Sequence, residues 1–452
     1  MKMAAKIAIY RKIQILLLWF GFFSQAFAIL SVEITEGQSS GLPIAIVPFG
    51  LEGTGHHGGG TEGVSAVIRS DLENSGQFSP TSFHQMTEFP HRREMVRYPY
   101  WKSLGAENIV IGEIKKTGGS RYTVHFELLD VVQQRAEGSP KPPLLAMQFD
   151  NVHADEFRAL AHHISDLIFE KLIGVKGIFS TRIAYVSTVP GSKGELYTLE
   201  VADSDGHNPK ALYRSSFPIM SPAWSPDGKR IAFVSFDKDR QSVNIVEVAT
   251  GKVQKITQFP GINNAPAWSP DNKTLALMLS KDGSSKIYLV DLEDKKLTRL
   301  TEGSSIDAEP CFTPDGRAVV FTSNRGGKPQ IYRVTLGSGQ IDRLTFNGDY
   351  NAKPSVTPDG KRLVMMHRGD NGLFSIAVQS LATGEFKIIT QSSLIDSPSL
   401  AANGMMVLYG IEEGDKEMLG AVSLDGRVKI RLPAREARVK CPAWSPFPYS
   451  KH

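Results

Sequence analysis

The C-terminal half of the sequence repeats with a fixed period, and this repeat restricts the possible folds more than any other feature. The segment from Pro222 reads PAWSPDGKRIAFVS, and the segment from Pro266 reads PAWSPDNKTLALML. Related segments begin at Pro310, Pro354, Pro398 and Pro442, so successive copies are spaced by 44 residues without an insertion. Such a period indicates a repeat protein in which each copy packs against its neighbours.

Each copy has the pattern of four short β-strands separated by turns. In the copy from Pro222 the strands are expected at PAWS, KRIAFVS, SVNIVEVA and KVQKIT. Pro226 presets φ in the first turn, Asp227 bonds to the local backbone and Gly228 accepts positive φ. The acidic residues repeated at this position are therefore interpreted as turn residues and not as a ring of functional carboxylates. They are Asp227, Asp271, Asp315 and Asp359.

The number of second strands predicts a β-propeller with six blades. These strands begin near residues 182, 230, 274, 318, 362 and 406. No second strand follows the last PAWSP segment, residues 442–446, so we expect it to complete the blade that begins at Arg182 and to close the ring. Cys311 and Cys441 then belong to opposed blades, farther apart than the Cα separation of about 7 Å that a disulfide allows. The sequence predicts two free thiols.

Residues 41–172 carry no repeat and alternate between strand and helix patterns, which predicts a small α/β domain. Strands are expected at residues 43–49, 108–114, 122–128 and 144–149, and helices at residues 64–74 and 155–172. A linker at residues 173–181 leads to the propeller at residues 182–446, and residues 447–452 form a tail. The fold class is α+β overall, a small N-terminal α/β domain followed by a six-bladed all-β propeller that the C-terminal strand closes.

The first 28 residues have the features of a cleaved secretory signal. Basic residues precede an apolar run at residues 13–23, and Ala26 and Ala28 flank Phe27 as a small-x-small cleavage site. The run is too short to cross a bilayer, which takes about 20 residues. No later segment is long enough either, so we expect no membrane insertion of the mature chain, which would begin with an extended segment at residues 29–40.

The charge of the chain argues against a nucleic-acid partner. The 51 basic and 47 acidic residues give a formal net charge of +4. Lys2, Lys6, Arg11 and Lys12 of the signal account for that excess, so the mature chain has no net charge. No basic stripe interleaved with aromatic residues remains to bind a phosphate backbone.

No segment has the spacing of a catalytic or metal-binding motif. The glycine-rich stretch at residues 53–60 lacks the lysine and hydroxyl of a phosphate-binding loop, and the pairs His56–His57 and His162–His163 stand without HExxH or CxxC. The GxSxG elbow of serine hydrolases is also absent. We expect a binding protein without catalytic residues, metal or cofactor. The alternatives are a secreted propeller enzyme of the lyase or lactonase type, acting at the channel, and a peptide- or glycan-binding propeller.

The connections from each outer strand to the next inner strand differ between copies, whereas the strands repeat. They are expected to surround one mouth of the central channel and to bind a partner chain. The candidate residues are Met220, Ser221, Asn263, Asn264, Ala265, Asp307, Ala308, Glu309, Tyr350, Asn351, Asp396 and Ser397.

The sequence resembles the TolB family of the Tol-Pal cell-envelope system over nearly all of the expected mature chain. The resemblance is carried, in family order, by PIAIVPF from Pro43, DLENSGQF from Asp71, WKSLGA from Trp101, SDLIFEKLIG from Ser165 and TRIAYV from Thr181. It implies a periplasmic scaffold, expected to be a monomer, which binds the lipoprotein Pal through the propeller mouth and TolA through the N-terminal region. Such an adaptor would support outer-membrane invagination during cell division and outer-membrane integrity.

The same resemblance places the TolA contact in an alternating N-terminal stretch that suits addition as an edge strand. This stretch comprises Ile29, Leu30, Ser31, Val32, Glu33 and Ile34. The Pal-facing connection of the family commonly reads FPxHNGAP, whereas here Ile262 replaces the histidine and Asn264 the glycine. Ala308 stands where the family has threonine. These departures predict a contact adapted to a divergent partner.

Overall fold

The computed structural model describes residues 30, 33–36, 41–51, 63–132, 142–191, 194–369, 372–392, 395–414, 416–432, 434 and 437–448. The expected signal segment, with Ala26 and Ala28, lies outside these residues. So do Ile29, Ser31, Val32 and the pair His56–His57. No helix in the described part of the chain is long and apolar enough to cross a membrane.

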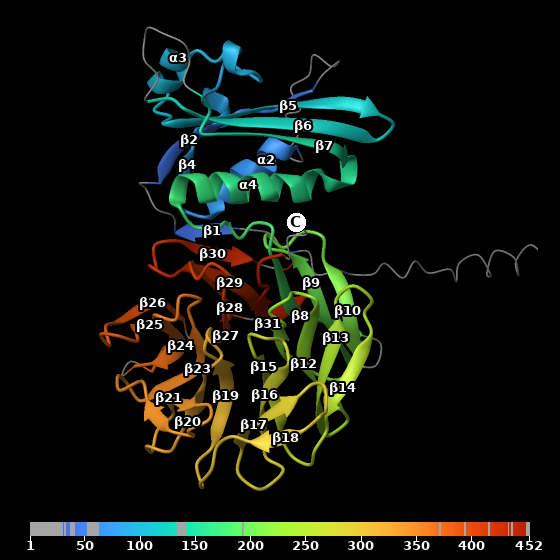
Figure 1. Cartoon of the computed structure of the whole chain (residues 1–452), viewed down its shortest axis with the longest axis vertical. Helices are drawn as coiled ribbons and strands as arrows, with labels where there is room; N and C mark the ends of the chain where they lie inside the picture. Colours follow the sequence, from blue (N-terminus) through green and yellow to red (C-terminus); the bar gives the residue numbers. More distant parts are fainter. Residues whose placement is uncertain are drawn as a thin grey trace, which may run out of the picture.

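Six antiparallel sheets follow the 44-residue repeat. They are arranged in a ring around a common centre (Figure 1). Blade one consists of β31 (Arg438–Trp444), β8 (Arg182–Gly191), β9 (Gly194–Asp203) and β10 (Lys210–Ser215). Blade two consists of β11 (Ile219–Trp224), β12 (Arg230–Asp237), β13 (Arg240–Glu247) and β14 (Val253–Thr257). Blade three consists of β15 (Asn263–Trp268), β16 (Thr274–Leu279), β17 (Lys286–Asp291) and β18 (Leu297–Arg299).

The other three blades repeat this order. Blade four consists of β19 (Asp307–Phe312), β20 (Ala318–Ser323), β21 (Gln330–Thr335) and β22 (Ile341–Arg343). Blade five consists of β23 (Tyr350–Val356), β24 (Arg362–Arg368), β25 (Phe374–Ser380) and β26 (Phe386–Ser392). Blade six consists of β27 (Ile395–Leu400), β28 (Met406–Glu413), β29 (Lys416–Ser423) and β30 (Lys429–Leu432).

The second strand of each blade is covered on both faces by the neighbouring blades. In β12 the five consecutive residues from Ile231 to Ser235 are all buried. A strand with one face in solvent would alternate between buried and exposed residues. The continuous apolar runs that mark each repeat in the sequence therefore reflect packing of blade on blade.

The C-terminal strand closes the ring, as predicted. β31 pairs with β8, with Trp444 opposite Ile183 and Val439 opposite Ser187. The indole Nε1–H of Trp444 donates to Thr181 Oγ1 at 2.8 Å. Cys311 in β19 and Cys441 in β31 are both free thiols. The predicted fold class is confirmed.

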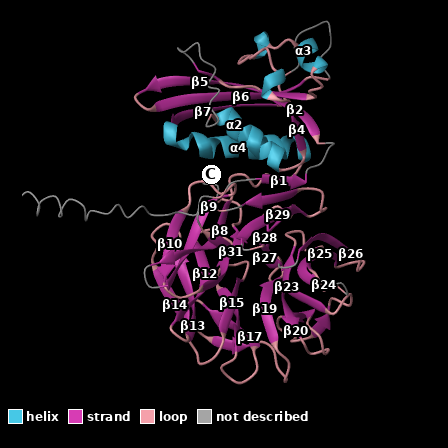
Figure 2. Cartoon of the chain, turned by 180° about the vertical axis from the view of Figure 1, so that it is seen from behind, coloured by secondary structure: helices cyan, strands magenta, loops and turns pink. Residues whose placement is uncertain are grey.

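The N-terminal domain is one mixed sheet with two helices on the face toward the propeller, as both views show (Figure 1, Figure 2). The sheet has the order β4 (Phe78–Pro80), β2 (Leu42–Ile46), β5 (Asn108–Gly118), β6 (Arg121–Asp130) and β7 (Leu145–His153), with β3 (Gly50–Leu51) beside β5. The helices are α2 (Val64–Asn74) and α4 (Phe157–Ile173). The predicted strands and helices are present, whereas β3 and β4 were not predicted.

A long connection covers the opposite face of this sheet. It contains η1 (Phe83–Gln85), η2 (Arg93–Met95) and α3 (Tyr98–Ser103), none of which was predicted. Trp101 of α3 is fully buried against Ile109 and Ile111 of β5. The sheet therefore has an apolar layer on each side, which explains the continuous burial at the start of β5.

Hydrogen bonds join the linker, residues 173–181, to both domains. The Asp166 carboxylate on α4 accepts from the backbone N–H groups of Phe179 and Ser180, at 2.8 and 3.1 Å. Asn403, in the turn between β27 and β28, donates to the carbonyl of Lys176 at 3.0 Å. The linker thus contacts the turn at the end of the inner strand of blade six.

Residues near the N-terminus add a further strand to the propeller. β1 (Glu33–Glu36) pairs antiparallel with β30 at the outer edge of blade six, with Glu33 opposite Arg431. Leu30 forms a bridge with Ala434 and is buried. Blade six is therefore a five-stranded sheet.

Candidate functional site

The candidate mouth residues lie mostly at the beginnings of the inner strands, where connections were expected. Each inner strand contains a β-bulge that shifts its pairing with the second strand. The residue before the repeated proline adopts the left-handed conformation in all six strands, with φ between 48° and 52°. These residues, named here the bulge ring, are Ser221, Ala265, Glu309, Lys353, Ser397 and Cys441.

The bulge ring is strained backbone. A left-handed L-residue is disfavoured by about 1–2 kcal/mol, and a residue before proline normally takes an extended conformation. Bulges terminate or redirect pairing and are frequent beside functional sites. Strained residues persist only where the surrounding structure holds them, and they cluster at sites that bind ligands. Six of them at one level of the propeller therefore mark this end as the candidate site.

Hydrogen bonds between neighbouring blades hold part of the ring. Ser221 Oγ of blade two donates to Asn264 Oδ1 of blade three at 3.0 Å, and the N–H of Ala265 donates to the same oxygen at 2.6 Å. In blade five, the N–H of Lys353 donates to Glu309 Oε2 of blade four at 2.9 Å. The strained residues are thus hydrogen-bonded across the seams between blades.

One ammonium group lies near two carboxylates at the mouth. Lys353 Nζ forms an ion pair with Asp396 of blade six and lies in the field of Glu309 of blade four. Burial alone would lower the pKa of Lys353, but the two carboxylates outweigh it and the pKa is raised. Burial opposes ionisation of Asp396, yet the charge of Lys353 holds its pKa below the usual range. Within the described chain, no histidine is paired with these groups.

Three of the candidate residues are fully buried, and their side chains bond to neighbouring residues of the propeller. Asn263 bonds to the backbone of Phe259 and Gly261, and Asn351 donates to Gln330 Oε1 at 2.9 Å. Asp307 pairs with Lys286 of the preceding blade, with 3.4 Å between Nζ and Oδ2. The equivalent residue is buried and apolar in the other three blades, namely Ile219, Ile395 and Val439.

The remaining candidates reach the surface to different degrees. Met220, Ser221, Asn264, Ala265, Ala308, Glu309, Tyr350 and Ser397 are partly exposed, and Asp396 is exposed. Large apolar side chains stand beside them in the connections. Phe259 is 36% exposed, Ile306 51% and Phe346 71%. The sequence analysis missed these three residues, although an apolar residue in an otherwise polar connection was a signal for them.

The expected TolA-binding stretch is placed in part. Leu30 packs in a core cluster with Ile183 and Met406, and Glu33 and Ile34 belong to β1. Of the two histidines at 162 and 163, His163 is exposed, whereas His162 is buried beside Asp71 of α2. A ring of six blades with a strained rim, polar seams and an accessory α/β domain defines a protein of the β-propeller class.

The similarities to known proteins agree with this class. Residues 169–448 match the TolB beta propeller domain, and residues 30–136 match the TolB amino-terminal domain. The chain belongs to the TolB family. It is similar to the Tol-Pal system protein TolB of Coxiella burnetii, with 56% identity over 428 residues that cover 94% of this chain and 96% of the relative.

Two further comparisons support the assignment. The Tol-Pal system protein TolB of Nitrosococcus oceani is 55% identical over 432 residues, which cover 95% of this chain and 96% of that protein. The crystal structure of TolB from Acinetobacter baumannii superposes with a TM-score of 0.84 at 38% identity and covers 92% of this chain and 100% of that one. The predicted family is confirmed: the chain is a component of the Tol-Pal system of the cell envelope and not an enzyme.

Proposed function

We propose that this chain is a periplasmic adaptor that binds Pal through the propeller mouth and TolA through residues 29–34. As a monomer it would link the layers of the envelope and support outer-membrane invagination and integrity during cell division. The bulge ring is the observation that carries the Pal site, because strained backbone held by hydrogen bonds presents side chains in a fixed arrangement. The exposed Phe259, Ile306 and Phe346 supply apolar area around it.

Replacing Glu309 or Asp396 by alanine is expected to weaken Pal binding by about tenfold to thirtyfold, a loss of about 1.4–2 kcal/mol. Each change removes a carboxylate at the mouth and frees Lys353 from one of its two partners. Titration calorimetry with purified Pal would measure the dissociation constants. Glu309→Gln keeps an oxygen that can accept from Lys353 and tests whether charge or hydrogen bonding matters.

Glu293→Ala is the matched control, because Glu293 is an exposed carboxylate in the turn between β17 and β18, at the other end of its blade from the bulge. It should leave Pal binding unchanged. Unaltered Pal affinity in a correctly folded Glu309→Ala and Asp396→Ala double variant would refute the proposed mouth site.

For the TolA contact, the pairing of β1 with β30 suggests competition. A strand that is already paired within the chain offers only one free edge. TolA could therefore pair with both edges of β1 only when β1 leaves blade six. Glu33 and Arg431 are opposite residues of the two strands. The double variant Glu33→Cys/Arg431→Cys would fix β1 in place when oxidised.

Oxidation of this variant is expected to abolish measurable TolA binding, and reduction should restore it. Surface plasmon resonance with immobilised TolA would measure both states. The single variants, exposed to the same oxidant, control for the two native thiols and for loss of the Arg431–Glu413 ion pair. Full TolA binding by the cross-linked protein would show that β1 need not leave blade six.

A further inference from the structure

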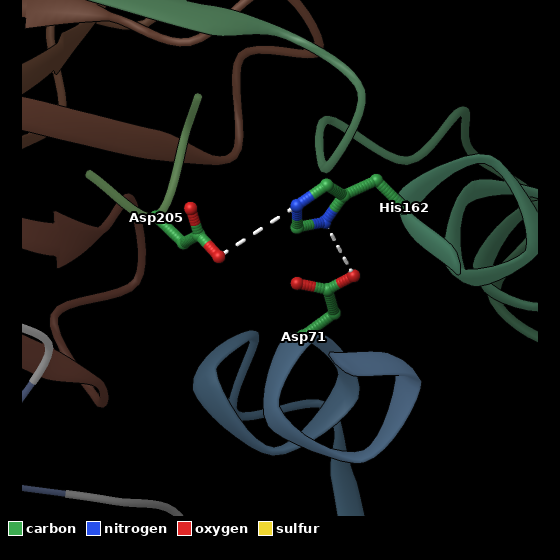
Figure 3. Close-up of side chains that lie close together, drawn as sticks. All are labelled: Asp71, His162 and Asp205. Carbon is green, nitrogen blue, oxygen red and sulfur yellow. Dashed lines mark hydrogen bonds and ion pairs between the residues drawn. The ribbon is translucent and has the colours of Figure 1, made fainter. Parts of the chain in front are cut away.

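A buried charged cluster joins the two domains at a place that the mouth and β1 do not use. His162 of α4 lies between two carboxylates, as Figure 3 shows. Its Nδ1 is 2.8 Å from Asp71 Oδ2 on α2, and its Nε2 is 3.6 Å from Asp205 Oδ2 in the turn between β9 and β10. His162 and Asp71 are each only 3% exposed. The imidazole therefore bridges both helices of the N-terminal domain and blade one.

The other charged groups around His162 come from α4 and from the same turn of blade one. Arg158, one helical turn before His162, forms an ion pair with Asp205 and lies 3.9 Å from Asp203. His207 Nδ1 is 3.3 Å from Asp205 Oδ1. Asp203 and Asp205 thus share one permanently charged guanidinium, and a protonated His162 would supply a second buried positive charge between Asp71 and Asp205.

The geometry favours an imidazolium over a metal ion. The ligand atoms of Asp71, His162 and Asp205 lie within 4.8 Å of one another. However, the two carboxylates contact opposite nitrogens of the ring, and Arg158 already occupies the Asp205 oxygen that faces Nε2. Nε2 is buried without a hydrogen-bond partner. A proton on this nitrogen would satisfy it by donating toward Asp205.

The pKa shifts of His162 and Asp205 agree with a protonated ring, whereas burial raises the pKa of Asp71. Burial alone would lower the pKa of His162, but its hydrogen bond to Asp71 and the charges of Asp71 and Asp205 outweigh burial, and the pKa is raised. Burial likewise opposes ionisation of Asp205, yet the histidines at 207 and 162 and Arg158 lower its pKa. Both pKa shifts favour the charged forms of His162 and Asp205, and therefore an ion pair across the domain boundary.

The turn that holds Asp205 also holds the N-terminal residues. Gly206 has a φ of 85°, and a Cβ at this position would come within 2.5 Å of Leu30 Cβ. The end of α2 contacts blade six in the same manner, since a side chain on Gly76 would overlap Val428, which directly precedes β30. The cluster and the position of Leu30 and β1 therefore depend on the same turn and helix.

We propose that Asp71, Arg158, His162 and Asp205 form a protonation-sensitive latch between the domains, and that loss of the His162 proton loosens the β9–β10 turn and releases Leu30 and β1. A group with a raised folded pKa contributes stability that is complete below its unfolded pKa, about 6.5 for histidine. This contribution is lost as pH rises through the folded pKa. The latch is closed in acid and opens toward alkaline pH.

Hydrogen exchange of the mature chain between pH 5.5 and 8.5 tests the latch. After correction for intrinsic rates, exchange of residues 30, 33–36 and 203–208 should become faster as pH rises above about 6.5, by at most about tenfold per pH unit, and should level off above the folded pKa, because only between these two pKa values does the closed state hold a proton that the open state has lost. His162→Gln should remove this dependence. His163→Gln is the matched control, since His163 is the next residue of α4 and is exposed, and it should behave as the wild type.

A second measurement does not depend on folding of the variant: the NMR titration of the wild-type His162 ring should give a pKa above 6.5. A lower value, or exchange without pH dependence in the wild type, would overturn the latch. Protection restored at alkaline pH by zinc would assign the cluster to a metal. The inference rests on the proposed function only where it concerns TolA binding. Hydrogen exchange is measured without TolA, so either proposal can fail while the other stands.

Discussion

Replacing Asp307 by alanine is expected to lower the free energy of unfolding by about 3–5 kcal/mol. The Asp307 carboxylate is fully buried and accepts from Ser323 Oγ at 2.6 Å and from Arg325 Nη2 at 3.0 Å. It is also the only carboxylate paired with Lys286 among the described residues, and Lys286 is 1% exposed. Its removal would leave an ammonium group buried without a countercharge between blades three and four. Urea unfolding would measure the change.

Asp315→Ala is the control within the same blade. Asp315 accepts from Thr313 Oγ1 and the N–H of Arg317 in an exposed turn, so its loss should lower stability by at most about 1 kcal/mol. The pKa of Asp307 is lowered because hydrogen bonds from Ser323, Thr301 and Arg325 outweigh the effect of burial. Its contribution is present above the unfolded pKa, about 3.9, and is lost as pH falls through the folded pKa. Equal stability losses in both variants at neutral pH would contradict the buried pair.

Ending the chain at Ala437 is expected to abolish cooperative unfolding of the propeller. The truncation removes β31, the partner of β8, and with it the buried Val439, Cys441 and Ala443. Blade one would then expose the edge of β8, and blades one and six would lose their shared apolar contacts. Circular dichroism melts would show a broad transition in place of a sharp one.

A chain that ends at Pro448 keeps β31 and serves as the control, with an unchanged melting temperature. A synthetic peptide of residues 438–448 should partly restore the transition of the truncated chain, because closure needs pairing and not covalent continuity. A truncated protein that melts like the control would show that the ring is stable without its closing strand.

The repeat made the architecture predictable because each copy carries its own strand pattern and turn. A fixed spacing of 44 residues leaves no room for an inserted element, so the blade count and the unpaired last segment followed from counting. The helices α2 and α4 were equally visible, since their apolar residues recur at helical spacing. These features are local, and local features can be found in a sequence.

The bulge ring could not be predicted in the same way. Ser221, Glu309 and Lys353 have no intrinsic preference for a left-handed backbone, and the following proline argues for an extended one. The conformation is imposed by packing of the assembled ring. Asn263, Asp307 and Asn351 were expected at the surface because they are polar, yet polar groups can be buried when each finds a partner.

The latch could not be predicted from the sequence for a related reason. His162 and Asp71 are 91 residues apart in sequence, and Asp205 belongs to the other domain. Neither spacing matches a motif, and the three groups meet only through the packing of α2 on α4 and the docking of α4 against blade one. The next residue, His163, is also a histidine, yet it is exposed.

The seams between blades differ in mechanical character. Hydrogen bonds and ion pairs join blades two to three, three to four and four to five through Asn263, Asp307 and Asn351, and such contacts fix both distance and direction. At the equivalent level the other three seams have Ile219, Ile395 and Val439, whose apolar contacts have no preferred direction and permit small sliding. The polar contacts of these seams lie at other levels, namely Lys353–Asp396, Trp224–Ala443 and Trp444–Ser399. The compliant half of the ring is the half that carries the N-terminal domain. We expect a partner at the mouth to displace blades five, six, one and two against each other more than it displaces the rest.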